Sequence, residues 1–67
     1  MVKLELNGEE RTFPRPLTVA DLLRELGINT PAVAVEVNRT VVPKSSHPTR
    51  RLEEGDRVEI VTFVGGG

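Results

Sequence analysis

Alternating apolar and polar residues predict a hairpin at the start of the chain. Residues 2–6 alternate with period two, which is typical of a strand that is buried on one face. Asn7-Gly8 follows, and both residues tolerate the positive φ that a tight hairpin turn requires. Residues 10–13 ("ERTF") predict the returning strand, which ends before Pro14 because proline cannot donate to a strand ladder.

Apolar residues spaced by three and four predict one short helix over about residues 18–26. Thr18 is a good N-cap, and Asp21 places a carboxylate near the positive end of the helix. Gly27 suits the left-handed position that closes a helix. One apolar stripe is formed by Val19, Leu22, Leu23 and Leu26. This helix therefore has one face to bury.

Period-two alternation returns in the second half of the chain and predicts three more strands. These cover about residues 33–38, 40–42 and 57–63, and a turn at Asn38-Arg39 joins the first two. The segment 43–51 ("PKSSHPTRR") is polar and has no period, so it predicts a long loop. We expect Leu52 to anchor this loop in the core.

The last predicted strand has two different faces. Val58 and Ile60 are expected to point inward, whereas Glu59, Val61 and Phe63 point to the opposite face of the sheet. These apolar side chains are covered by a partner protein, by the chain's own 43–51 loop or by the chain's own end. We favour a partner, because aromatic residues are enriched in interface cores.

The element order β-β-α-β-β-β predicts an α+β fold. One helix with one apolar stripe needs a sheet face to cover, so we expect a mixed sheet of four to five strands with the helix across one face. The last strand is expected beside the first, parallel to it, in the centre. This arrangement is the β-grasp, or ubiquitin-like, fold. We predict a β-grasp domain over residues 1–64 and a flexible glycine tail over 65–67.

Composition narrows the classes of function. The 67 residues make one domain, and without cysteine there is neither a disulfide framework nor a thiolate metal site. A net charge of −1 gives no basic face for nucleic acid. The chain starts without a signal-peptide pattern and contains no apolar run long enough for a membrane span. We therefore expect a cytoplasmic protein that binds neither nucleic acid nor membrane.

Side-chain catalysis is not expected. His47 is the one histidine, and in a polar loop we expect it to be solvated rather than catalytic. The scattered carboxylates do not form a metal-ligand cluster, so we expect no metal and no bound cofactor. The chemistry is therefore expected at the glycine tail. Glycine has no side chain, so such a tail is thin and leaves the Gly67 carboxylate sterically open to react.

Several segments together resemble the sulfur carrier family of thiamine biosynthesis. The residues that carry the resemblance are "VAVEVN" (33–38), "VVP" (41–43), "LEEGDRVEIV" (52–61) and the glycine tail, and it covers essentially the whole chain. The resemblance implies that the protein is not an enzyme. An ATP-dependent activating enzyme would adenylate the Gly67 carboxylate, a sulfur donor system would convert it to a thiocarboxylate, and thiazole synthase would receive the sulfur. ATP would be used by the activating enzyme.

The same resemblance implies a partner-binding surface next to the tail. Its residues would be Val61, Phe63, Val64, Gly65 and Gly66. Gly66 would be the second glycine of the family's Gly-Gly ending, and Gly65 an extra residue before that pair. Three other readings remain open: a sulfur carrier for molybdopterin synthesis or for tRNA thiolation, a β-grasp module that binds RNA, and a protein adaptor that never reacts.

Overall fold

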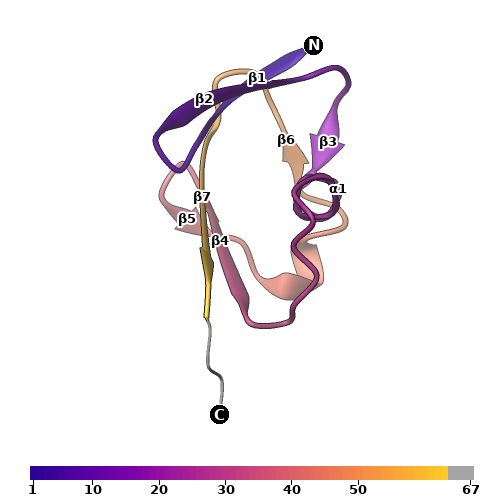
Figure 1. The fold of residues 1–67 in the computed structure, drawn as a ribbon, viewed down its shortest axis with the longest axis vertical. Helices are drawn as coiled ribbons and strands as arrows, with labels where there is room; N and C mark the ends of the chain where they lie inside the picture. Colours follow the sequence, from indigo (N-terminus) through magenta and orange to yellow (C-terminus); the bar gives the residue numbers. More distant parts are fainter. Residues whose placement is uncertain (64–67) are drawn as a thin grey trace.

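A five-stranded mixed sheet with one helix across one face forms the protein (Figure 1). The computed structural model describes residues 1–63. The strands are β1 (Val2–Leu6), β2 (Glu9–Phe13), β4 (Val33–Val37), β5 (Thr40–Val41) and β7 (Arg57–Thr62). Their order is β2-β1-β7-β4-β5, with β1 and β7 parallel and the other neighbours antiparallel. The predicted mixed sheet with a central parallel pair is confirmed.

The core lies between the sheet and helix α1 (Val19–Glu25). Alternate residues of β1, β4 and β7 are buried, as the period-two pattern predicts. On the last strand Val58 and Ile60 are buried, and Leu52 anchors the preceding loop in the same core. The apolar stripe of α1 buries Val19, Leu22 and Leu23, while Leu26 packs against the core at its margin.

Two asparagines with positive φ begin the two hairpin turns. Asn7 (φ 48°) precedes Gly8 between β1 and β2, and Asn38 (φ 52°) precedes Arg39 (φ 69°) between β4 and β5. Positive φ at both central residues gives the turn twist that suits a two-residue hairpin. Both predicted turns are therefore confirmed.

Helix α1 begins with a capping box. The Asp21 N–H donates to the Thr18 hydroxyl (3.1 Å), and the Thr18 N–H donates to the Asp21 carboxylate (3.0 Å). The first two helical amides donate instead to the loop after β5: Val19 N–H to the Arg50 carbonyl and Ala20 N–H to the His47 carbonyl, both at 2.9 Å. At the other end Gly27 has φ 72°, as predicted.

The segment 43–51 is more ordered than the sequence pattern predicts. It contains the 3-10 turn η1 (Lys44–Ser46), and the strand β6 (Arg51–Leu52) pairs antiparallel with β3 (Leu17–Thr18). The sequence pattern predicted five strands and missed the two short strands β3 and β6. Two-residue strands are too short to show a period, and this ladder forms only because the loop folds back onto the start of the helix.

Candidate functional site

The end of β7 carries an exposed apolar pair, Val61 and Phe63. Their relative exposures are 53% and 58%, although both are large hydrophobic residues. Val61 lies on the sheet face opposite α1, because it follows the alternation of β7, in which Val58 and Ile60 point into the core. Phe63, directly after β7, continues the parity of Val61. The predicted orientation of this strand is confirmed. The chain's own 43–51 loop lies at the start of the helix and leaves both side chains exposed.

Hydrogen bonds on both sides fix β7 in place. The Asn7 side chain accepts from the Ile60 N–H (2.7 Å) and donates to the Ile60 carbonyl (3.1 Å). From the opposite side, the Asn38 side chain accepts from the Arg57 N–H (3.0 Å). The Phe63 N–H donates to the Ala32 carbonyl (2.9 Å), so pairing along β4 continues to the last described residue. The end of β7 and Phe63 are therefore held at a fixed place beside β4.

Two glutamates lie beside this apolar pair on the same outer face. The register of β4 and β7 places Glu36 directly opposite Glu59, and Ala34 directly opposite Val61. Within residues 1–63, four ion pairs involve other carboxylates, and neither of these two glutamates takes part in one. A hollow of about 320 Å³ is lined by Asn7, Ala34, Glu36, Glu59, Ile60 and Val61.

Sequence reasoning missed this glutamate pair. Strand parity placed Glu59 outward, but the position opposite it depends on the register between two strands that are far apart in the sequence. The repeated Val-x-Val pattern of residues 33–37 does indicate that Glu36 points outward. No sequence signal fixes which outward residue of β4 meets Glu59.

His47 is buried, so the expectation that it is solvated was wrong. Its side chain is 8% exposed, and Nε2 lies 3.2 Å from the Val42 carbonyl oxygen. Because a carbonyl only accepts, Nε2 carries the proton in this contact. The turn η1 directs the ring inward, and the His47 carbonyl caps α1 through Ala20. The residue therefore holds the loop against the helix.

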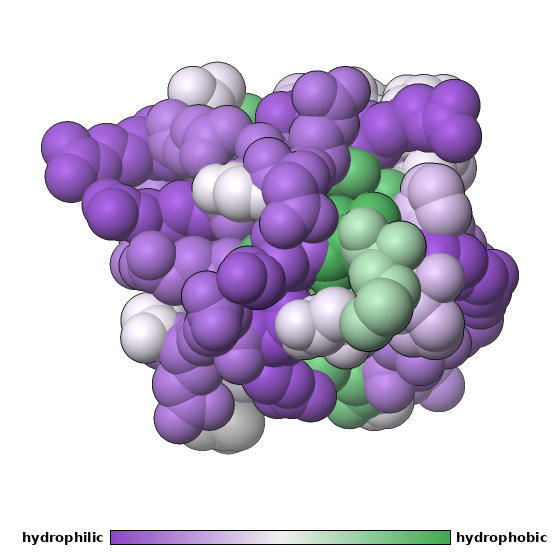
Figure 2. Space-filling model, turned by 90° about the horizontal axis from the view of Figure 1, so that it is seen from above, coloured by the Kyte–Doolittle hydropathy of each residue, from purple (hydrophilic) through white to green (hydrophobic). Residues whose placement is uncertain are grey.

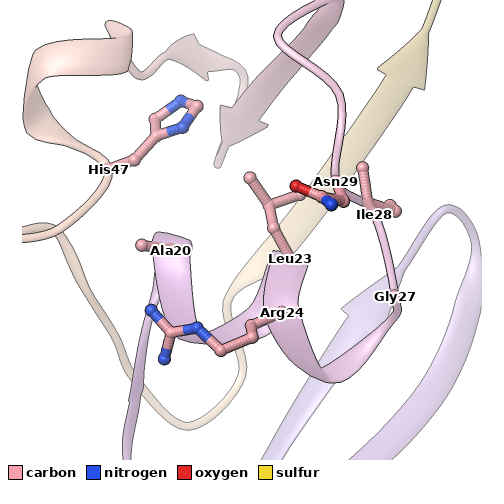
Figure 3. A pocket seen from close by; sticks show the side chains of 7 residues that line it. All are labelled: Ala20, Leu23, Arg24, Gly27, Ile28, Asn29 and His47. Atoms are coloured by element: carbon pink, nitrogen blue, oxygen red, sulfur yellow. The ribbon is translucent and has the colours of Figure 1, made fainter.

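A second hollow, of about 610 Å³, lies between His47 and helix α1 (Figure 3). Leu23 and Ile28 supply its apolar part, and Arg24 lies on its far side from the histidine. The guanidinium of Arg24 is already paired with Asp21 at 3.2 Å. The hollow therefore shows no convergent set of polar groups that would assign it a reaction.

The face seen in Figure 2 is dominated by hydrophilic residues. Viewed from above, over β1 and β2, most of the molecule is hydrophilic with one hydrophobic area to one side (Figure 2). Within residues 1–63, no group of histidines and carboxylates could hold a metal ion. In the same part of the chain, no helix is long and apolar enough to cross a membrane. The predicted site residues Val64, Gly65, Gly66 and Gly67 lie outside the described residues.

The family model described as the ThiS family matches residues 4–67. The sulfur carrier protein ThiS of Thermus thermophilus is 40% identical, over 92% of this chain and 95% of its own length. That of Bacillus subtilis is 35% identical, over 96% of this chain and 98% of its own. The crystal structure of the thiamine biosynthesis protein ThiS from Geobacter metallireducens superposes with a TM-score of 0.84 at 32% identity, covering 98% of this chain and 100% of that one.

A longer relative matches over only part of its length. The thiazole synthase of Paramagnetospirillum magneticum is 52% identical over 98% of this chain, but the chain spans only about 20% of that protein. The match over nearly the full length of the small relatives, together with the shared fold, decides the assignment. The chain belongs to the ThiS family, the sulfur carrier proteins of thiamine biosynthesis.

Proposed function

We propose that the Gly67 carboxylate is the group that carries the sulfur. In this proposal an ATP-dependent adenylating enzyme joins the carboxylate to AMP, with loss of pyrophosphate. Sulfur at the oxidation level of sulfide (HS⁻), delivered by a donor system, then attacks the acyl carbon, displaces AMP and leaves a thiocarboxylate. The protein is the co-substrate of these steps and supplies no catalytic side chain and no bound cofactor.

Elementary chemistry supports this order of steps. A carboxylate is a poor electrophile at neutral pH, and AMP provides it with a good leaving group. Exchange of one oxygen for sulfur then gives a soft nucleophile that stays covalently attached. The residues Gly65 and Gly66 have no side chains, so they would let the terminus enter a narrow channel on a partner.

Thiazole synthase is the proposed acceptor of the sulfur. The support is that this chain is 52% identical to a segment that makes up about 20% of a protein named thiazole synthase. A second thiazole synthase, from Magnetococcus marinus, is 39% identical over 98% of this chain. We assign the exposed pair Val61 and Phe63, with Val64, to docking on the synthase and on the adenylating enzyme. The observation that carries the proposal is that exposed apolar side chains lie at the end of the described residues, next in sequence to the glycine tail.

Intact-mass measurement tests the chemistry. We expect incubation with the adenylating enzyme of the same organism, ATP and the sulfur donor to raise the mass by one sulfur-for-oxygen exchange, localised to Gly67 by fragmentation. Omission of ATP is the control and should leave the mass unchanged. An unchanged mass in the complete mixture, with an adenylating enzyme that is shown to be active on a second sulfur carrier protein, would refute the proposal.

Substitution of Phe63 tests the docking face. Phe63→Asp should weaken binding to both partner enzymes while the midpoint of thermal unfolding changes little, because the side chain is exposed. The matched control is Thr12→Asp, which places the same charge on an exposed residue of edge strand β2, beside the start of β1 and away from the end of β7. Equal loss of binding in both variants would argue against a docking role for Phe63.

A further inference from the structure

The opposed pair Glu36 and Glu59 has an unfavourable local arrangement. Residues directly opposite on one sheet face have Cβ atoms about 5 Å apart, and like charges at that position destabilise a sheet. The register makes these two carboxylates direct neighbours. None of the four ion pairs found within residues 1–63 brings a lysine or arginine to either of them. Within the described residues, no ion pair therefore compensates the two neighbouring carboxylates.

The carboxylates line a hollow that the polar residue Asn7 and the apolar residues Ala34, Ile60 and Val61 complete. Ala34 and Val61, opposite each other in the next register position, line the same space of about 320 Å³. Ala34 is the smallest outward residue of β4, so its short side chain leaves a depression in the sheet surface between the glutamates and the exposed end of β7. Such a hollow suits a long side chain with an aliphatic stem and a cationic head. Lysine and arginine have this structure.

The hollow adjoins the docking pair assigned above. Val61 belongs to both, and Phe63 follows two residues later on the same strand face. Any protein that covers Val61 and Phe63 therefore also covers the hollow and removes water from the two carboxylates. Uncompensated carboxylates would oppose such an interface, whereas a cation from the partner would support it and set its orientation.

We propose that Glu36 and Glu59 receive a lysine or arginine side chain of thiazole synthase, with its stem against Ala34 and Val61. This inference rests on the proposed function, since it takes thiazole synthase as the partner. That choice follows from the relatives in which an equivalent chain is part of a thiazole synthase. The two carboxylates then determine which surface of the partner can bind, and the apolar pair Val61 and Phe63 supplies contact area.

Binding measurements on charge-neutral variants test the inference. The double variant Glu36→Gln/Glu59→Gln should bind the thiazole synthase of the same organism about tenfold more weakly than the wild type, and its affinity should depend less on salt concentration. The matched control is Glu9→Gln/Glu53→Gln, which removes the same charge at two exposed positions away from this hollow. The control should bind almost as well as the wild type.

Two further variants separate recognition from folding. Glu59→Lys turns the repulsive pair into an attractive one, so we expect a higher unfolding midpoint together with weaker binding. Ala34→Leu fills the hollow without a change of charge and should also weaken binding. If Glu59→Lys lowers the free energy of unfolding by as much as it weakens the free energy of binding, the inference is contradicted.

The outcomes also distinguish this inference from the function on which it rests. If Phe63→Asp weakens binding but the glutamate double variant binds like the wild type, the docking face stands and the cation site is refuted. If the wild type does not bind the synthase, both are refuted. If the double variant loses affinity only for the adenylating enzyme, the assignment to thiazole synthase is wrong. The assignment is also wrong if sedimentation measurements show that this face joins two copies of the chain.

Discussion

At the scale of single residues, Asn7 serves two purposes at once. Its positive φ forms the first hairpin turn, and its side chain continues the pairing of β7 beyond the end of β1 through both polar groups of Ile60. Few side chains can do both, since an asparagine tolerates left-handed backbone and carries one donor and one acceptor group. The hairpin was predictable from Asn7-Gly8, but the bonds to Ile60 were not, because they join residues 53 positions apart.

We expect Asn7→Ala to lower the free energy of unfolding by about 1–3 kcal/mol. The variant loses both hydrogen bonds to Ile60 and places alanine at positive φ. Urea unfolding followed by circular dichroism measures the change. Asn29→Ala is the control, because Asn29 is exposed. Equal stability of the two variants would show that the bonds to Ile60 contribute nothing.

At the scale of elements, helix α1 is seven residues long and depends on its caps. Isolated helices of this length are unstable in water, so packing and capping must hold it. The amide of Asp21 is bonded within the capping box, whereas those of Val19 and Ala20 require the loop that contains His47. The helix was predictable because its stripe and cap are local. Burial of His47 was not, because local polarity suggests a solvated loop and only the fold brings that loop to the helix.

The capping box makes stability depend on acid pH. The hydrogen bond from the Thr18 backbone N–H lowers the pKa of Asp21, and the Thr18 hydroxyl contact and nearby Arg24 act in the same direction. A depressed folded-state pKa means that the unfolded chain binds the proton first as the pH falls. This contribution is therefore fully present above about pH 4 and is lost as the pH falls through the folded-state pKa.

We expect Asp21→Asn to be less stable than the wild type at neutral pH, and the difference to shrink below about pH 4. Urea midpoints measured across this range give the comparison. Glu9→Gln changes an exposed carboxylate outside the capping box and should keep a constant offset from the wild type. A difference for Asp21→Asn that stays constant with pH would exclude this role of its carboxylate.

At the scale of the whole molecule, the chain enters and leaves the sheet at opposite ends. Strands β1 and β7 are parallel neighbours, so the start of β1 and the end of β7 point away from each other (Figure 1). Met1 is strongly exposed and lies far from the exposed pair at the end of β7. This topology followed from the sequence pattern, since one helix stripe and alternating strands leave few arrangements. The glutamate pair required the register and was visible only in the fold.

We expect an extension after Gly67 to abolish sulfur transfer, because an amide there removes the carboxylate that is proposed to react. The same extension before Met1 should leave transfer intact. Thiazole formation in a reconstituted reaction, with intact mass recorded before and after, measures both. Transfer by a carrier that keeps its C-terminal extension throughout would refute the assignment of Gly67.

The central position of β7 also decides how the domain responds to force. A pull on its end runs along the strand, parallel to β1 and antiparallel to β4, so the bonds on both flanks are loaded in shear and resist together. The asparagine side chains that hold Arg57 and Ile60 share that load. An edge strand pulled from its hairpin would instead open one bond at a time. A partner that drew in the C-terminal segment would therefore pull on a strand that is hydrogen-bonded along both of its edges.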